Sequence, residues 1–455
     1  MKLTVLGGGG FRTPYIYHAL LDDPGRPRVT ELALFDPSPS RLRAMEAVLA
    51  QLGASAPDAP RVTTTTDART AIEGSDFVFA AVRAGGLEGR RCDEQIARDL
   101  GVLGQETTGP GGIAFAIRTV PVMLEYARLI AELAPGAYLL NFTNPAGIVT
   151  EALQTVLGAR VIGICDTPSG LCRRLARAAG LPADRLAADY VGLNHLGWLR
   201  GLRHDGRDVL PDLIADDRML ESLEEAHIFG PAWIRALGEI PNEYLHYYYN
   251  HREALRSIRD ASSTRGEQLA RSQGELFARL EESPHLAAKL WLDAVNERNA
   301  GYMAEARGAT AAADEEKERS TQDVLAAGYA GVAIGVLRAI SRDERATMIL
   351  NVRNGGTIHG LPHDAVIEVP ALVDADGASP LSTPPPSLHQ LGLMQQVKAV
   401  EQHAINAAVH RDRTEALKAF ALHPLVDSVA VGGRLLAGYM DRIPEVAAAL
   451  GASGS

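Results

Sequence analysis

The sequence predicts an α/β protein with an N-terminal Rossmann-like parallel sheet and a C-terminal α+β domain. Short apolar strand patterns alternate with helical patterns up to residue 164, as in a parallel sheet covered by helices on both faces. The first strand runs directly into the glycines 7–10 and then into a helix, which is typical of a dinucleotide-binding start. After Trp198 helical stretches follow one another. We therefore expect an NAD-binding domain over 1–195 and a substrate-binding and oligomerisation domain over 196–455.

The elements expected along the chain follow from these patterns. Strands are expected at 3–6, 31–35, 75–82, 137–142 and 160–164, and helices at 13–21 and 113–133. The C-terminal half is expected to hold helices at 217–226, 266–280, 287–299 and 388–408 and paired strands at 347–352 and 365–369. Segment 306–321, rich in alanine and glutamate, is expected to be a loop or an exposed helix without chemistry. Because parallel strands end at one edge of a sheet, the polar clusters that follow them should meet there.

Length and composition limit the class of protein. The chain has 455 residues and 46% hydrophobic content, enough for a large core and two or more domains. Its net charge of -11 argues against binding a polyanion such as nucleic acid. Three cysteines, an odd number, favour a reducing compartment, so we expect the cytoplasm. The sequence shows neither a signal-peptide pattern nor an apolar run of membrane-spanning length, so we expect no membrane association.

The glycine loop and the strand after it indicate a nucleotide site. Gly7 and Gly9 match the first two glycines of the dinucleotide-binding fingerprint, whereas Arg12 stands where a third is expected. Asp36 ends the second predicted strand, where an acidic residue accepts hydrogen bonds from a ribose, and this favours NAD over NADP. A plain glycine loop is the alternative, which the strand context and Asp36 disfavour. The residues assigned to the cofactor are Gly7, Gly9, Gly10, Phe11, Arg12 and Asp36.

Cys165 and His195 are candidate metal ligands. Cys165 follows a predicted buried strand, and a thiolate with a neutral imidazole binds divalent transition metals. Two protein ligands would leave positions open for the oxygens of a substrate, as in a catalytic metal site. The alternative is that Cys165 is a small buried hydrophobic residue.

Tyrosine and arginine side chains complete the set of candidates. Tyr244 can act as a base only if a nearby cation or metal lowers its pKa well below about 10. The neighbouring tyrosines 247–249 are expected to form an aromatic interface. A guanidinium offers a planar fork to phosphate or carboxylate, and Arg83 and Arg90 are preferred because glycines flank them near a strand end. Other candidates are Arg91 and Arg265.

Several segments in this order resemble the family 4 glycoside hydrolases. They are residues 7–14, 104–112, 141–145, 165–168, 192–196 and 244–248. The resemblance covers nearly the whole chain and continues through 351–356. It implies an NAD+-dependent hydrolase that also needs a divalent metal, usually Mn2+, and that often acts on sugars phosphorylated at C6. The implied fold is a Rossmann domain followed by a domain like that of lactate and malate dehydrogenases, in a homodimer or homotetramer.

The resemblance also implies a mechanism and roles for residues. NAD+ takes a hydride from C3 of the sugar, Tyr244 removes the C2 proton, the C1 group is eliminated, water adds and the hydride returns. Cys165 and His195 would hold a metal on the C2 and C3 oxygens. By the same resemblance Asn144 contacts sugar hydroxyls and Arg90 holds the 6-phosphate. Arg265 is a further substrate contact, and Glu106 lies near the metal.

Two features of the sequence point to different anomers of the substrate. Segment 85–90 resembles the 6-phospho-β-glucosidase branch, so we predict hydrolysis of 6-phospho-β-glucosides. Asp166 also occurs in the 6-phospho-α-glucosidase branch, where it protonates the leaving oxygen, so α-linked substrates are the alternative. A hydroxy-acid dehydrogenase is a third hypothesis, but it would need no cysteine ligand and would accumulate NADH. A non-catalytic NAD-binding protein would have no use for Cys165, His195 and Tyr244.

Overall fold

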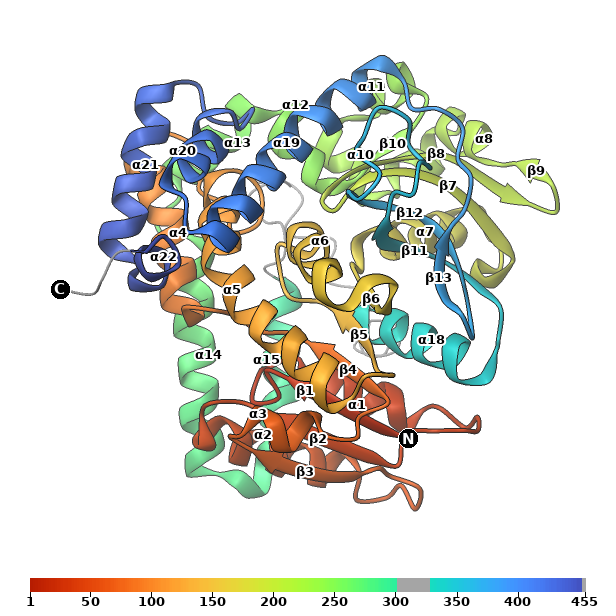
Figure 1. Ribbon diagram of the computed structural model, residues 1–455. Helices are drawn as coiled ribbons and strands as arrows, with labels where there is room; N and C mark the ends of the chain where they lie inside the picture. Colours follow the sequence, from red (N-terminus) through yellow and green to blue (C-terminus); the bar gives the residue numbers. More distant parts are fainter. Residues whose placement is uncertain (301–327, 452–455) are drawn as a thin grey trace.

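A computed structural model describes residues 1–300 and 328–451 of the chain (Figure 1). The segment 306–321, expected to be a loop or an exposed helix, lies outside the described residues. Residues 1–80 form the lower part of the molecule in Figure 1, and residues 186–260 and 387–442 form the upper part. Two long helices of the C-terminal half, α14 (Arg265–Glu282) and α15 (Ala287–Ala300), extend down beside the N-terminal part and pack on its helices.

The N-terminal half is a parallel sheet of six strands in the order β3-β2-β1-β4-β5-β6. This is the strand order of a dinucleotide-binding Rossmann domain. Five of the strands are almost wholly buried, which explains why their sequences are mostly apolar runs. β3 was not expected, because it is a half-exposed edge strand in which threonines replace the apolar run. The strands are β1 (Lys2–Leu6), β2 (Glu31–Phe35), β3 (Arg61–Thr65), β4 (Phe77–Ala80), β5 (Tyr138–Asn141) and β6 (Val161–Gly163).

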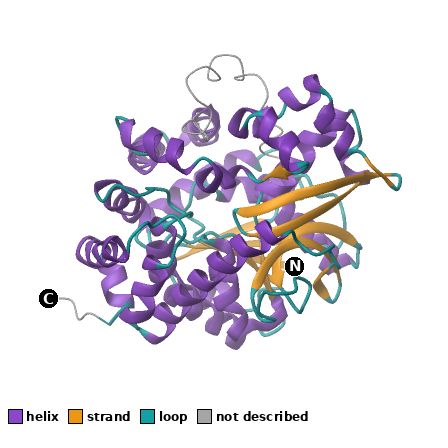
Figure 2. Ribbon diagram, turned by 90° about the horizontal axis from the view of Figure 1, so that it is seen from above, coloured by secondary structure: helices purple, strands orange, loops and turns teal. Residues whose placement is uncertain are grey.

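Helices lie on either side of the strands (Figure 2). The predicted helix over 13–21 is α1, and the one over 113–133 begins three residues earlier, at Pro110. The residue before this helix, Gly109, has φ +84°, a backbone conformation that glycine adopts without strain. The helices of this half are α1 (Thr13–Leu21), α2 (Pro39–Leu52), α3 (Ala68–Ile72), α4 (Gly86–Asp99), α5 (Pro110–Leu133), α6 (Ala146–Leu157) and α7 (Thr167–Ala179), with the short 3₁₀ turns η1 (Gly158–Arg160) and η2 (Ala183–Arg185).

The sheet continues into the C-terminal half. The predicted strand pair over 347–352 and 365–369 is confirmed as an antiparallel pair, β11 (Ala346–Arg353) with β12 (Val366–Asp374). One residue pair, Asn351 with Gly163, joins β11 to β6, and another, Glu368 with Gly192, joins β12 to β7 (Leu186–Leu193). These two pairs fuse the halves into one continuous sheet. The remaining strands are β8 (Leu196–His204), β9 (Arg207–Asp208), β10 (Ile240–Pro241) and β13 (Gly377–Pro380).

The hairpin β7–β8 was not expected, since no strand was predicted between residues 164 and 347. β8 extends to His204, and Trp198 itself is a wholly buried residue within it. β7 precedes residue 195 but pairs with β8 and β12, which belong to the C-terminal half. The division at residue 195 stays a prediction.

The C-terminal helices surround this part of the sheet. The single helix predicted over 217–226 is wrong, because the extended backbone of Leu223 separates α9 from α10. Helices α19, α20 and α22 pack on α5. No helix in the described part of the chain is both long and apolar enough to cross a membrane. The helices not yet given are α8 (Leu210–Ala215), α9 (Asp217–Glu221), α10 (Glu224–Phe229), α11 (Pro231–Leu237), α12 (His246–Tyr249), α13 (His251–Asp260), α18 (Tyr329–Arg342), α19 (Leu388–His410), α20 (Arg413–Ala421), α21 (Val429–Arg442) and α22 (Pro444–Ala449), with the 3₁₀ turns η3 (Glu243–Leu245) and η4 (Pro284–Leu286).

Candidate active site

The loop between β1 and α1 is tight and lies against the end of β2. The amides of Gly7 and Gly8 both donate to the carbonyl of Phe35, at 3.0 and 2.8 Å, and Gly10 donates to Gly7 at 2.9 Å. Gly7 has φ +86°, and a Cβ there would lie 2.7 Å from the carbonyl oxygen of Ala81. Only glycine fits this position, as a backbone that must approach a pyrophosphate requires.

Asp36 lies directly beside this loop. Its Oδ2 accepts from the amide of Gly9 at 3.2 Å, and its Oδ1 accepts from the amide of Ser38 at 3.0 Å. Burial raises the pKa of Asp36, although the two amide bonds act in the opposite direction. The predicted nucleotide residues Gly9 and Asp36 are therefore in contact, at the strand end where a ribose binds in this fold.

Phe11 and Arg12 are fixed by the C-terminal half. The Trp291 indole on α15 donates to the carbonyl of Phe11 at 2.9 Å, and the Tyr329 hydroxyl on α18 donates to that of Arg12 at 3.0 Å. The Arg12 guanidinium lies 4.5 Å over the ring of Phe142 and 5.0 Å over that of Tyr329. Arg12, which stands where the dinucleotide-binding fingerprint has a third glycine, is thus held by cation–π contacts with two aromatic rings.

Arg83, Arg90 and Glu106 form one ionic cluster, in which Arg90 is buried and the other two side chains are partly buried. Glu106 accepts from Arg83 Nη1 at 2.8 Å and lies 2.7 Å from Arg90 Nη1. Arg90 also donates from Nε to Glu94 at 2.9 Å. Burial raises the pKa of Glu106, but the charges of Arg83 and Arg90 outweigh it and lower that pKa to about 2. The structure therefore brings together three of the predicted substrate-binding residues, with the carboxylate charged.

A further cation near this cluster, Arg298, was missed by sequence reasoning. Burial lowers its pKa to about 9, and repulsion by Arg12 and Arg90 acts in the same direction. Arg298 comes from the last turn of α15, where an arginine reads as an ordinary favourable helix end, so the sequence gives no signal for it. An excess of positive charge around Glu106 suits a phosphate group.

The predicted contact Arg265 lies behind this cluster. Its Nη2 donates to the carbonyl of Arg298 at 3.2 Å, and its neighbour Gly266 donates from its amide to Glu94 at 2.6 Å. Arg265 therefore supports the backbone that carries Arg298. The candidate Arg91 pairs instead with Glu88 on the surface of α4.

Cys165 and Asp166 connect β6 to α7, and His195 lies in the two-residue turn between β7 and β8. His195 has φ +62°, an uncommon conformation for a residue with a side chain, and such strain persists where the surroundings fix it. Burial lowers the pKa of His195 to about 4, while the charges of Asp166 and Glu106 oppose this. Its ring is therefore neutral at pH 7. Burial, and then the charges of Glu368 and Asp166, raise the pKa of the Cys165 thiol.

Tyr244 lies face to face with His195. The two ring centroids are 3.8 Å apart and the planes are 2° from parallel. Asn242 accepts from the amide of Tyr244 at 3.0 Å and so caps the turn η3 that carries it. Burial lowers the pKa of Arg90, but the negative charges of Glu106 and Glu94 outweigh burial, so that the pKa is raised overall. Tyr244 makes a smaller contribution in the same direction as the two carboxylates. The predicted base is thus stacked on a predicted metal ligand and lies within the field of the arginine cluster.

Asn144 follows β5 at the same edge. Its Oδ1 is buried and finds no hydrogen-bond donor in the part of the chain that the structure describes. A buried amide oxygen without a donor is costly unless a ligand supplies one. The hydroxyl group of a sugar is such a donor, which fits the predicted role of Asn144.

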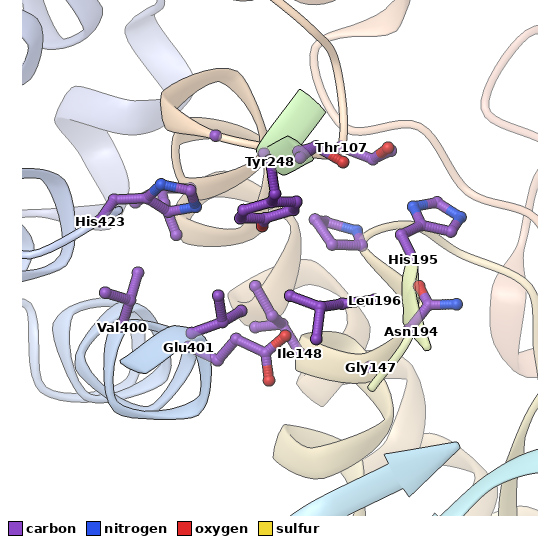
Figure 3. Close-up of a pocket in the computed structure, with 16 residues that line it drawn as sticks. Thr107, Gly147, Ile148, Asn194, His195, Leu196, Tyr248, Val400, Glu401 and His423 are labelled. Carbon is purple, nitrogen blue, oxygen red and sulfur yellow. The ribbon is translucent and has the colours of Figure 1, made fainter. Parts of the chain in front are cut away.

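A small cavity of about 30 Å³ is lined by His195, Tyr248 and Glu401 among others (Figure 3). In this view Tyr248 stands between His195 and His423, and Glu401 of α19 lies below. Ligand pockets usually measure about 300–1,000 Å³, so this cavity is too small for a sugar. A wider hollow of about 690 Å³, lined by Trp198, Trp233 and Tyr249 among others, contains no predicted site residue. Neither space is lined by Cys165 or by the arginines of the cluster.

Comparisons with known proteins match almost the whole chain. The model of the family 4 glycosyl hydrolases matches residues 2–181, and that of the family 4 glycosyl hydrolase C-terminal domain matches residues 190–426. The chain is 32% identical to a Bacillus subtilis protein named "Probable 6-phospho-beta-glucosidase", over 96% of this chain and 95% of the relative. It is 30% identical to 6-phospho-alpha-glucosidase 1 of Lacticaseibacillus paracasei, over 96% and 95%.

Solved structures show the same fold. The 6-phospho-β-glucosidase of Thermotoga maritima, solved with manganese, NAD+ and glucose-6-phosphate, has a TM-score of 0.83 and 27% identity, covering 98% of this chain and 99% of that one. A malate dehydrogenase from Salinibacter ruber has a TM-score of 0.51 at 15% identity, covering 91% of this chain and 99% of that one. The predicted Rossmann-like domain with a dehydrogenase-like C-terminal part is therefore confirmed.

Proposed function

The chain belongs to family 4 of the glycosyl hydrolases, and from this premise we propose that it hydrolyses 6-phospho-β-glucosides with NAD+ and a divalent metal ion, preferably Mn2+, as cofactors. The observation that carries this proposal is the stack of Tyr244 on His195, which lies within the field of the arginine cluster. A base, a neutral nitrogen ligand and a phosphate-sized cationic site are needed together for the reaction.

The residues of the glycine loop fit NAD+. The loop of Gly7, Gly9 and Gly10 leaves no room for a Cβ at Gly7, and Asp36 presents a carboxylate beside Gly9. Arg12 adds a positive charge at the start of α1, where the pyrophosphate of a dinucleotide lies in this fold. Trp291 and Tyr329 fix the carbonyls of Phe11 and Arg12, so this loop is held before the nucleotide binds.

Cys165 and His195 fit a transition metal by the chemistry of their donors. A buried imidazole with a pKa of about 4 is neutral, as a metal ligand must be. Within residues 1–300 and 328–451 no group of three or more histidine, cysteine, aspartate or glutamate side chains could hold a metal. A metal on these two residues would leave positions for the oxygens of the sugar.

The arginine cluster, Asn144 and Tyr244 bind the substrate or act on it. Arg83 and Arg90 hold the 6-phosphate, and Glu106 fixes both guanidinium groups through its two oxygens. The unsatisfied amide oxygen of Asn144 accepts from a sugar hydroxyl. These contacts orient the sugar with C2 toward Tyr244, which removes the C2 proton.

The bound cofactors supply a hydride acceptor and donor for C3 and a positive charge for the C2 and C3 oxygens. Loss of the C2 proton to Tyr244 lets the bond from C1 to the leaving oxygen break, and Asp166 protonates that oxygen. Water then adds to C1 and gives a proton to Asp166, while Tyr244 returns its proton to C2. Return of the hydride to C3 makes the net reaction a hydrolysis. No pair of carboxylates acts on C1 directly, unlike in most glycosidases.

The alternative substrate is a 6-phospho-α-glucoside. It is supported by Asp166, next to Cys165, and by the relatives, which include 6-phospho-α-glucosidases as well as 6-phospho-β-glucosidases. We favour the β-anomer because the segment 85–90, which forms the start of α4 and carries Arg90, is the longer match to that branch. We further propose the domain division at residue 195, a homodimer or homotetramer, and a cytoplasmic location.

A substrate panel tests the proposal. The purified protein is assayed with p-nitrophenyl α- and β-glucosides, each with and without a 6-phosphate, in the presence of NAD+, Mn2+ and a reductant. We expect release of nitrophenol from the β-linked 6-phosphate alone, without accumulation of NADH. Cleavage confined to the α-linked or the unphosphorylated sugars would overturn the assignment. Stoichiometric NADH from a hydroxy acid would instead identify a dehydrogenase.

A further inference from the structure

A buried polar network is centred on Glu368 of β12. Its Oε1 accepts from Asn351 Nδ2 at 2.9 Å and from Asn194 Nδ2 at 3.2 Å, and its Oε2 accepts from the Tyr190 hydroxyl at 3.1 Å. Glu368 and Asn351 have no exposed surface. In the described part of the chain three side chains donate to Glu368, and a carboxylate accepts from all three of them.

The backbone places this carboxylate between the two predicted ligand loops. Glu368 pairs with Gly192 on β7, and its partner Asn351 pairs with Gly163 on β6. Cys165 follows Gly163 by two residues, and Asn194 immediately precedes His195 in the turn. The hydrogen bond from Asn194 therefore fastens the strained turn at its first residue, next to the positive φ of His195.

A second arm of the network reaches Tyr244. The Tyr190 hydroxyl, which donates to Glu368, accepts from Asn242 Nδ2 at 3.1 Å. The side-chain Oδ1 of Asn242 accepts from the backbone N–H of Tyr244 at 3.0 Å. The backbone N–H of Asn242 donates to the carbonyl of Gly197 at 2.9 Å. Both ends of the Asn242 side chain are thus occupied, one by Glu368 through Tyr190 and the other by the turn that carries Tyr244.

We propose that Glu368 is a positioning residue that sets the stack of Tyr244 on His195, through Asn194 on one side and through Tyr190 and Asn242 on the other. This inference rests on the proposed roles of His195 and Tyr244. Residues behind metal ligands fix the orientation of the ligand, and their loss typically lowers metal affinity or activity about 10–100-fold. A rigid network of this kind holds a site near its productive geometry.

The two arms are separated by substitution. Tyr190→Phe removes the hydroxyl that links Glu368 to Asn242 and leaves Asn194 in place. Asn194→Ala breaks the other arm, and Glu368→Gln disturbs both. Tyr439→Phe is the matched control, since it removes a buried tyrosine hydroxyl that donates to the carbonyl of Asp93 at 3.0 Å, outside the network.

Three measurements are made on each full-length variant. Mn2+ affinity is measured by electron paramagnetic resonance, and kcat and KM are measured with a substrate carrying hydrogen or deuterium at C2. The chemical shift of the His195 Cε1 proton, assigned with His195→Gln, reports the stacked Tyr244 ring without any turnover. We expect Tyr190→Phe to lower kcat about tenfold, to increase the deuterium effect and to move the His195 shift, with Mn2+ affinity within twofold of the wild type.

Asn194→Ala should weaken Mn2+ binding at least tenfold, Glu368→Gln should show both effects, and Tyr439→Phe should show neither. Variants of Glu368 and Tyr190 that lose stability as Tyr439→Phe does, while keeping the wild-type His195 shift, Mn2+ affinity and isotope effect, would overturn the proposal. If the wild type releases nitrophenol from no glucoside, the proposed function fails. The His195 shift then still decides whether Glu368 sets the stack.

Discussion

Replacing Glu106 by glutamine tests the charge balance of the arginine cluster. In the folded chain the pKa of Glu106 falls from its ordinary 4.5 to about 2, because Arg83 and Arg90 outweigh the effect of burial. At about 1.4 kcal/mol per pKa unit, this difference corresponds to about 3 kcal/mol of stability in favour of the charged carboxylate. We therefore expect Glu106→Gln to lower the free energy of unfolding by about 3 kcal/mol at pH 7.

The pH dependence of this difference gives a sharper test. Since the pKa of Glu106 is lower in the folded state, its contribution is complete above pH 4.5 and is lost as the pH falls toward 2. Urea unfolding, followed by tryptophan fluorescence, should show a constant gap between wild type and variant from pH 7.5 to 5. The gap should shrink to about half near pH 3.2.

The matched control is Glu132→Gln. Glu132 also accepts two bonds from one guanidinium, that of Arg69, but both side chains are about half exposed. Exposed ion pairs contribute little because water and salt screen them, so this variant should unfold like the wild type. Equal losses in the two variants, or a gap for Glu106→Gln that does not change with pH, would refute the reasoning.

Three further predictions concern the cofactors. Cys165→Ser should abolish hydrolysis while NAD+ still binds, as equilibrium dialysis can check; hydrolysis at the wild-type rate would remove Cys165 from the site. Asp36→Ala should weaken NAD+ binding at least tenfold by calorimetry, because a charged acceptor contributes about 1.5–3 kcal/mol, and unchanged affinity would contradict its role. Gly7→Ala should lower both Tm and NAD+ affinity, because its Cβ would lie 2.7 Å from the Ala81 oxygen, whereas Gly74→Ala, at φ +67° in open space, should lower Tm alone.

The parallel half of the fold was predictable because its central strands are buried on both faces. A continuous apolar run such as 31–35 or 137–142 needs no knowledge of its partners. The hairpin β7–β8 was missed for the opposite reason: β7 begins with half-exposed residues and its central Asp189 breaks the apolar pattern. The helix expected over 217–226 failed because its periodicity continues across an extended residue, Leu223.

The candidate site was predictable where its residues follow strand ends. Asp36, Asn144 and Cys165 all occupy such positions, and the fold brings these ends to one edge. Arg298 could not be predicted, because only the packing of α15 against the N-terminal half brings it near Arg12 and Arg90. Glu368 was missed as well, since a glutamate within a strand normally faces solvent, and its partners come from distant strands.

The pairing of β7 with β12, which helps to join the two halves of the sheet, determines where this chain can be recombined with a relative. A chimaera that takes residues 1–195 from one parent and the rest from another would unite Tyr190 and Asn194 of the first with Glu368 of the second. The crossover belongs before Leu186, so that the whole hairpin β7–β8 is inherited together with β12. With that crossover, a chimaera that exchanges the nucleotide-binding half between enzymes of opposite anomeric preference would take Tyr190, Asn194 and Glu368 from the same parent. The hydrogen bonds of Glu368 would therefore be kept.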